Sequence, residues 1–109
     1  MDDKTELLSG TLDLLVLRVL NGGPLHGFAI AERIHVLSRE VLVVEEGSLY
    51  PALYRMEAKG WIEAEWGQSD KRRRAKFYEL TRTGRKQLDA EQQLWDRTAL
   101  AIRDVLKNA

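Results

Sequence analysis

The sequence contains no cysteine, and this absence excludes disulfide bonds and thiolate metal sites. Histidine is scarce as well, with only His26 and His35 in the chain. If they lay on one helix, their spacing would place them on opposite faces, so they cannot hold a metal ion together. We therefore expect neither a metal site nor a bound cofactor.

A run long and apolar enough to span a bilayer is also lacking. The apolar stretch near the N-terminus is interrupted by Asp13 and Arg18. The chain starts with acidic residues rather than the basic residues of a signal peptide. We therefore expect no membrane association and a cytoplasmic location. A length of 109 residues with 44% hydrophobic content suits one domain with a modest core.

The net charge of zero hides an uneven distribution. Residues 71–86 hold eight basic side chains and one acidic side chain, which gives this segment a charge of +7 and leaves −7 for the rest. A local basic patch on an acidic body suits a polyanion that is bound at one place. Taken alone, the same run could also be a solvated surface.

Residues 47–60 predict a short helix with exposed polar side chains. Leu49, Leu53 and Met56 recur at helical spacing and form its buried stripe. Pro51 requires a position near the helix start, because a proline deep in a helix removes a backbone donor. The glycine at the end of this stretch fits the left-handed position that stops a helix.

Residues 61–66 and 75–80 alternate between apolar and polar side chains and predict two strands. The loop between them is rich in arginine and turn-forming residues, which indicates a β-hairpin. The residues expected to face inward are Ile62, Ala64, Trp66, Tyr78 and Leu80.

Two further helices are expected before this unit. The first starts near Thr11 after a loosely helical N-terminus, and it is apolar almost all round, so it needs cover on more than one side. The second runs from Gly27 to Ser38, after a break at residues 21–24. Its expected buried stripe is Ile30, Ile34 and Leu37, and we expect Val43 or Val44 of the following connector to enter the core.

Thr81 can cap a long helix from Arg82 to Lys107. Residues seven apart along it form a heptad-like seam, and the helix is longer than a three-helix body needs. We interpret the surplus as a dimerisation arm that packs on the partner's first helix; the alternative is a terminal helix folded on its own domain. The expected interface residues are Leu12, Leu15, Val16, Leu88, Trp95, Ala99, Ile102 and Leu106.

The fold class is therefore mainly α with a small β-hairpin, a winged helix-turn-helix over residues 1–81 followed by a dimerisation helix over 82–109 in one compact unit. Four motifs in this order resemble the PadR family of bacterial transcriptional regulators: Gly23–Phe28, Gly47–Leu53, Lys59–Ile62 and Tyr78–Gly84. The resemblance covers about residues 7–106, and the single long terminal helix is similar to the short PadR subgroup.

This resemblance implies a homodimeric repressor that binds a roughly palindromic operator in double-stranded DNA. It places the third helix in the major groove and the hairpin at the adjacent backbone or minor groove. Some family members bind small aromatic molecules near a tryptophan of the long helix, a place that Trp95 would occupy here.

The expected DNA-binding residues come from two arguments. The resemblance supplies Ser48, Tyr50, Pro51, Tyr54 and Arg55 on the third helix, and the charge pattern supplies Lys71, Arg72, Arg73, Arg74 and Lys76 on the hairpin. Arg55 can read a guanine edge, bind a phosphate, or pair with Glu57 or another neighbour. Ser48 can bind a phosphate or simply cap the helix. One of the two tyrosine rings could belong to the core.

The two rival classes of function are an enzyme and a winged helix for RNA or protein partners. The stretch Gly47–Pro51 is not the G-x-S-x-G turn of a hydrolase, and His26 is better suited to a structural hydrogen bond than to catalysis, so we expect no catalytic residues. An arginine-rich hairpin beside exposed tyrosines would also serve RNA, so a winged helix for RNA or protein partners stays open.

Overall fold

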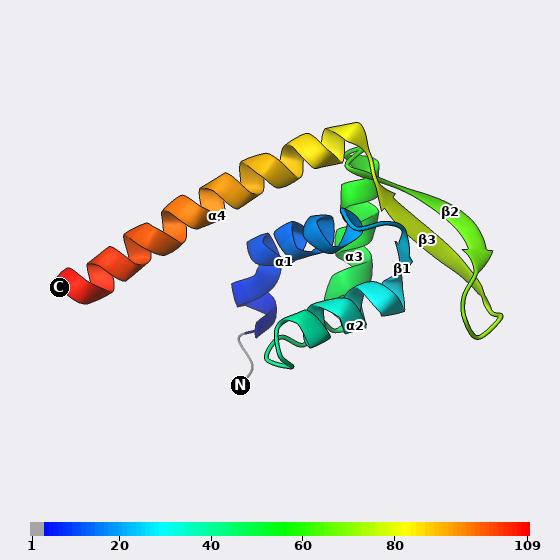
Figure 1. Cartoon of the computed structure of the whole chain (residues 1–109), viewed down its shortest axis with the longest axis horizontal. Coiled ribbons are helices and arrows are strands. Elements are labelled where there is room, and N and C mark those ends of the chain that lie inside the picture. Colours follow the sequence, from blue (N-terminus) through cyan, green and yellow to red (C-terminus); the bar gives the residue numbers. More distant parts are fainter. Residues whose placement is uncertain (1–3) are drawn as a thin grey trace.

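The computed structural model describes residues 4–109, with side chains from Gly10 onward. Four helices and a small sheet follow one another as expected (Figure 1). The elements are α1 (Lys4–Leu20), β1 (Leu25–His26), α2 (Gly27–Leu37), α3 (Glu46–Ala58), β2 (Ile62–Gln68), β3 (Arg74–Leu80) and α4 (Arg82–Asn108). The first helix begins before Thr11, and residues 1–3 of the expected loose N-terminus lie outside the described part.

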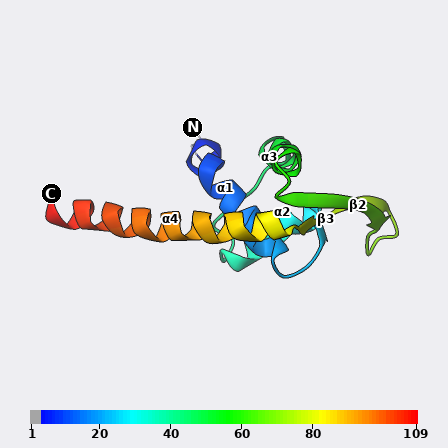
Figure 2. The same ribbon diagram turned by 90° about the horizontal axis from the view of Figure 1, so that it is seen from above.

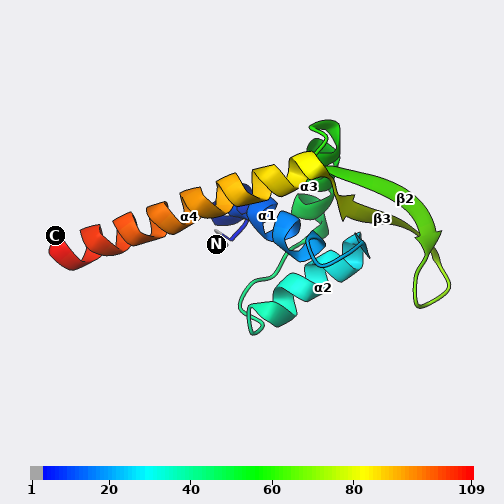
Figure 3. The same cartoon turned by 45° about the horizontal axis from the view of Figure 1, so that its top comes forward.

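The three strands form an antiparallel sheet in the order β1-β3-β2. The hairpin register pairs Ile62 with Leu80 and Trp66 with Lys76. The hairpin of β2 and β3 runs away from the helical body as a curved wing (Figure 3). The fold is therefore the predicted winged helix-turn-helix, and of the two alternatives for Leu25 and His26, a short strand or the entry of α2, the structure has the strand, β1, beside β3.

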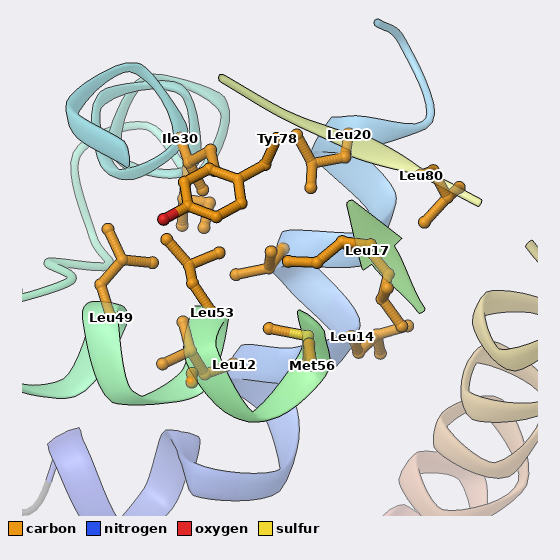
Figure 4. Packing of buried hydrophobic residues seen from close by; sticks show 14 of the residues in the cluster. Leu12, Leu14, Leu17, Leu20, Ile30, Leu49, Leu53, Met56, Tyr78 and Leu80 are labelled. Carbon is orange, nitrogen blue, oxygen red and sulfur yellow. The ribbon is translucent and has the colours of Figure 1, made fainter. Parts of the chain in front are cut away.

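One core fills the space between α1, α2, α3 and the inner face of the sheet. Leu17, Ile30 and Leu53 have no exposed surface, and Tyr78 reaches from β3 toward the side chains of α2 and α3 (Figure 4). At about 25 cal/mol for each Å² of apolar surface removed from water, such burial is the main driving force of folding. The prediction that Tyr78 and Leu80 face inward is confirmed.

Hydrogen bonds to backbone groups hold the joint between α3, the wing and α4. Gly60 adopts a φ of +78°, and the Trp61 N–H then donates to the Met56 carbonyl at 3.0 Å, which ends α3 as predicted. The Thr81 hydroxyl oxygen accepts from the Gly84 N–H at 2.9 Å, so Thr81 caps α4 as expected.

Two predicted placements inside the fold were wrong. Trp66 is 58% exposed although it alternates with buried residues, because the strand outruns the helices that would cover it. Leu37 is 65% exposed because it lies at the last residue of α2, beyond the core. Other predictions are confirmed: Val44 of the connector packs against the core, while Val43 does not. The helix α3 starts at Glu46, next to the predicted start near Gly47. Pro51 lies in its second turn, and the carbonyl that it leaves unpaired belongs to the exposed Gly47 and is open to water.

The first turns of α4 lie along α1, and the rest of the helix extends beyond the body (Figure 2). Leu12, Val16 and Leu88 are at most 4% exposed within this one chain. They were expected at a dimer interface, but the core of a single protomer already buries them. The apolar character of α1 on most sides is thus satisfied largely by α2, α3, α4 and the sheet.

Candidate nucleic-acid interface

The outer face of α3 carries the two tyrosines predicted to face DNA. Tyr54 is 77% exposed and Tyr50 is 44% exposed, while Leu49 and Leu53 fill the core from the opposite face. The expectation that one ring could be part of the core does not apply to Tyr54. Tyr50 lies across the start of α2, where the space that a Cβ at Gly27 would occupy is 2.5 Å from its hydroxyl oxygen.

Ser48 does not cap α3. The N-cap of α3 is Glu45, which makes no side-chain capping bond, and the Ser48 N–H donates to the Glu45 carbonyl at 3.0 Å. That N–H is therefore not free for a phosphate, and any contact from Ser48 must come from its half-buried hydroxyl. Glu45 and Glu46 are both exposed beside it, and their charges oppose phosphate at this end of α3.

Arg55 is held by a carboxylate of α1. Its Nη2 lies 2.5 Å from Oδ1 of Asp13, and the Asp13 side chain is only 12% exposed. The expected ion-pair alternative for Arg55 is therefore realised, with Asp13 rather than Glu57 as the partner. Glu57 instead accepts from Lys76 of β3 at 3.3 Å. Each ion pair ties α3 to a neighbouring element.

The wing tip presents exposed cations on an ordered turn. Lys71, Arg72, Arg73 and Arg74 are all exposed. The Arg72 N–H donates to the Ser69 carbonyl at 2.8 Å, and Arg72 adopts a φ of 60°. Backbone hydrogen bonds thus fix the direction in which these side chains leave the loop, as a surface for phosphates requires.

A groove of about 920 Å³ separates the wing from the starts of α2 and α3. Tyr50 of α3 lines it together with Arg73, Arg74 and Lys76 of the hairpin. The groove thus brings one predicted residue of α3 together with the hairpin cations, while Ser48, Pro51, Tyr54, Arg55 and Arg72 do not line it. Tyr78 also lines it, and burial raises the pKa of its hydroxyl while the nearby Lys76 opposes that shift.

The family follows from comparison with known proteins. A family model described as "Transcriptional regulator PadR-like family" matches residues 16–90, which is more than half of the chain. This chain belongs to the PadR family. Among solved structures, a transcriptional regulator from Clostridium thermocellum is 28% identical with a TM-score of 0.83, over 91% of this chain and 96% of that one.

Two solved structures of PadR proteins agree with this assignment. A PadR-like regulator from Bacillus cereus is 25% identical with a TM-score of 0.80, covering 95% of this chain and 99% of that one. A PadR family regulator from Clostridium difficile is 31% identical with a TM-score of 0.73, covering 86% and 96%. The chain is thus a PadR-like transcriptional regulator rather than an enzyme, and DNA-binding regulation is the function of the family.

Other features of this PadR chain bear on rival readings. His26 caps α2, because its Nδ1 accepts from the Ala29 N–H at 3.2 Å, so it has the structural role expected of it. Within residues 4–109, no helix combines the length and apolarity that crossing a membrane requires. The described side chains also include no group of three or more potential metal ligands.

The outer part of α4 carries an uncovered apolar face. Trp95 is 47% exposed, Ile102 54% and Leu106 79%, and helical spacing aligns them with the half-buried Ala99. A shallow hollow of about 470 Å³ beside this face is lined by residues between Arg97 and Leu106, and Trp95 is not among them. The predicted seam is present on one chain, but one chain does not enclose a site at Trp95.

Sequence reasoning missed three residues that the structure brings to the site. Asp13 was available as a signal, since a carboxylate in an apolar helix needs a partner once it is buried. Phe28 lies off the Ile30 and Ile34 stripe of α2 and is 65% exposed, as that spacing allowed. The exposure of Trp66 had no local signal, because it depends on where the helical body ends.

Proposed function

We propose that this chain is a homodimeric repressor that binds a pseudo-palindromic operator in double-stranded DNA, and that it acts in the cytoplasm, where that DNA lies. The observation that carries the proposal is the common groove, because Tyr50 of α3 lines one side of it and the exposed wing cations Arg73 and Arg74 line the other. A helix that enters a major groove and a hairpin that reaches the neighbouring minor groove have this relation.

The proposed contacts divide by chemistry. Phosphate contacts supply affinity and base contacts supply specificity. We assign the wing cations to phosphate, and we assign Tyr54 and the exposed part of Arg55 to the floor of the major groove. Asp13 holds one nitrogen of the Arg55 fork, which leaves less of it for a bidentate guanine contact. The proposed set is Ser48, Tyr50, Pro51, Tyr54, Arg55, Lys71, Arg72, Arg73, Arg74 and Lys76.

Dimerisation is proposed for the exposed seam of α4 together with the partner's α1. Leu15 of α1 is half-buried, and Trp95, Ala99, Ile102 and Leu106 of α4 keep apolar surface that no other part of the described chain covers. Two such faces related by a twofold axis would cover one another. A planar aromatic effector would then bind between paired Trp95 rings, or these rings would simply form the interface core.

Selection of genomic fragments with the purified protein tests the proposal directly. We expect enriched duplexes with two related half-sites spaced by one helical turn, about 34 Å, or a multiple of it. Transcription from a promoter carrying such a site should fall when the protein is added. Preference for structured RNA over the selected duplex in competition gel shifts would contradict the proposal.

A wing variant gives the matching physical test. Arg73→Ala should weaken binding to all duplexes alike and lower the slope of log K against log salt by about 1, because one phosphate contact is lost. Arg103→Ala is the control, since Arg103 is equally exposed but lies near the end of α4. Fluorescence titration with planar aromatic compounds on wild type and Trp95→Leu tests the effector site separately.

A further inference from the structure

We infer that the groove between the wing and the starts of α2 and α3 holds a stretch of sugar–phosphate backbone, with Phe28 and Trp66 packed on the deoxyribose rings. This inference rests on the proposed function. If α3 occupies a major groove and the wing tip the adjacent minor groove, the strand that separates the two grooves must pass between α3 and the wing. Figure 3 shows that the start of α2 faces the wing, and residues of both line the groove.

The wing side of the groove combines an aromatic face with cations. Strand alternation puts Trp66, Arg74 and Lys76 on the face of the hairpin that continues the core-facing side of Tyr78, and all four residues line the groove. The Arg74 guanidinium lies 4.9 Å from the centre of the Trp66 ring. This stacking holds the cation beside the Trp66 ring, and Trp66 as a whole is 58% exposed.

The helical side of the groove presents a second exposed aromatic ring. Phe28 lies in the first turn of α2 and is 65% exposed, so the core does not require it. His26 caps this turn through the Ala29 N–H and packs edge-on against Phe77 of β3 at 5.3 Å between ring centres. The cap therefore fixes the turn that carries Phe28 relative to the sheet.

The chemistry of the two walls matches one kind of occupant. A DNA strand alternates anionic phosphates with apolar deoxyribose rings, so it needs cations and apolar faces in alternation. Four cationic side chains line the groove against two carboxylates, which leaves it positive. The two carboxylates are Glu32 and Asp70, and the cations are Lys71, Arg73, Arg74 and Lys76. Rings that pack on sugars read no bases, so these contacts contribute affinity without sequence preference.

Duplex binding by Phe28→Ser and Trp66→Ser, measured by fluorescence anisotropy over a salt series, tests the inference. Each variant should lose about fivefold in affinity, because binding no longer buries an aromatic face of roughly 40 Å². The loss should be equal for the selected operator and an unrelated duplex, and the salt slope should not change for Phe28→Ser. Arg74→Ala should lower the slope by about 1.

Val36→Ser is the matched control, because Val36 is 61% exposed on the same helix but lies at its far end. Unfolding in urea should show that all of these variants fold. Wild-type affinity for duplex DNA in both aromatic variants would overturn the inference and leave the proposed function standing. A loss confined to the operator would also overturn it, since that result assigns the rings to bases. Failure of the wild type to bind any duplex would instead remove the proposed function.

Discussion

Arg55 of α3 donates a hydrogen bond to the nearly buried carboxylate of Asp13 on α1, across 42 residues of sequence. A buried carboxylate is costly unless a cation or several donors accompany it. The pair thus joins α3, the helix proposed to enter the major groove, to α1, which lies beside the first turns of α4. It also limits how far Arg55 can reach toward DNA, because releasing it would leave Asp13 without its partner.

Arg55→Met should therefore destabilise the fold more than Asp13→Asn. The first change leaves a charge without a partner in a largely buried place and should lower the free energy of unfolding by about 2–3 kcal/mol. The second leaves a half-exposed arginine in water and should cost about 1 kcal/mol. Urea unfolding at neutral pH measures both. The double variant should recover part of the Arg55→Met loss, and strictly additive losses would show that the two side chains do not interact.

Gly27→Ala should impair DNA binding more than it impairs folding. A Cβ at Gly27 would lie 2.5 Å from the Tyr50 hydroxyl, so the flexible Tyr50 side chain must turn out of its place in the groove. The loss of a hydrogen bond from Tyr50 to phosphate should reduce duplex affinity about tenfold. Gel shifts and urea unfolding on the same sample separate the two effects.

Tyr50→Phe is the comparison for that variant, because it removes the hydroxyl and keeps the ring in place. An affinity loss as large as that of Gly27→Ala would assign the effect to the hydroxyl alone. Unchanged DNA binding in both variants would remove Tyr50 from the proposed site.

The limits of sequence-based prediction are visible in individual residues. The alternation of apolar and polar residues along β2 correctly placed Trp66 on the same face as Ile62. It does not indicate where the helices that cover this face end, and so it did not predict that Trp66 is exposed. The signals that end α3 and cap α4 are local, which is why Gly60 and Thr81 were predicted correctly. The partner of Arg55 was not local, so the sequence offered only the general expectation of a neighbouring carboxylate.

The same distinction applies to the dimer seam. Heptad spacing along α4 correctly identified an apolar face, and Trp95 and Ile102 remain exposed on it. Spacing did not separate this face from the protomer's own core, where Leu88, at the base of the helix, is already buried. Which apolar residues a single chain buries depends on tertiary packing that no periodic pattern contains.

Gly84→Ala should damage the joint between the wing and α4. A Cβ at Gly84 would collide with the backbone carbonyl of Trp61, which cannot turn aside as a side chain can. We expect a loss of at least about 3 kcal/mol in the free energy of unfolding. Gly47→Ala is the matched control, because no atom lies within 4 Å of its added Cβ. That helical position should gain up to about 1 kcal/mol. Equal stability of the two variants would show that the contact between Gly84 and the Trp61 carbonyl does not limit the joint.

The exposed apolar seam on α4 can be tested as the contact that holds the proposed dimer together. Trp95→Asp and Ile102→Asp should each convert the proposed dimer to a monomer at micromolar concentration, because a carboxylate would be buried against the partner's apolar face. Leu100→Asp is the matched control, since Leu100 is 59% exposed on the opposite side of the same helix. Sedimentation velocity measures the mass, and circular dichroism checks that α4 stays helical.

The monomeric variants should also lose the selected operator while keeping the weak binding of a single half-site. Linking two half-site contacts in one dimer makes the second contact intramolecular, so the loss should be about 100-fold or more. A Trp95→Asp protein that sediments as a dimer and binds the operator like wild type would show that the twofold contact lies elsewhere. In that case the exposed face of α4 would need a different partner, and the half-site spacing would no longer report on this helix.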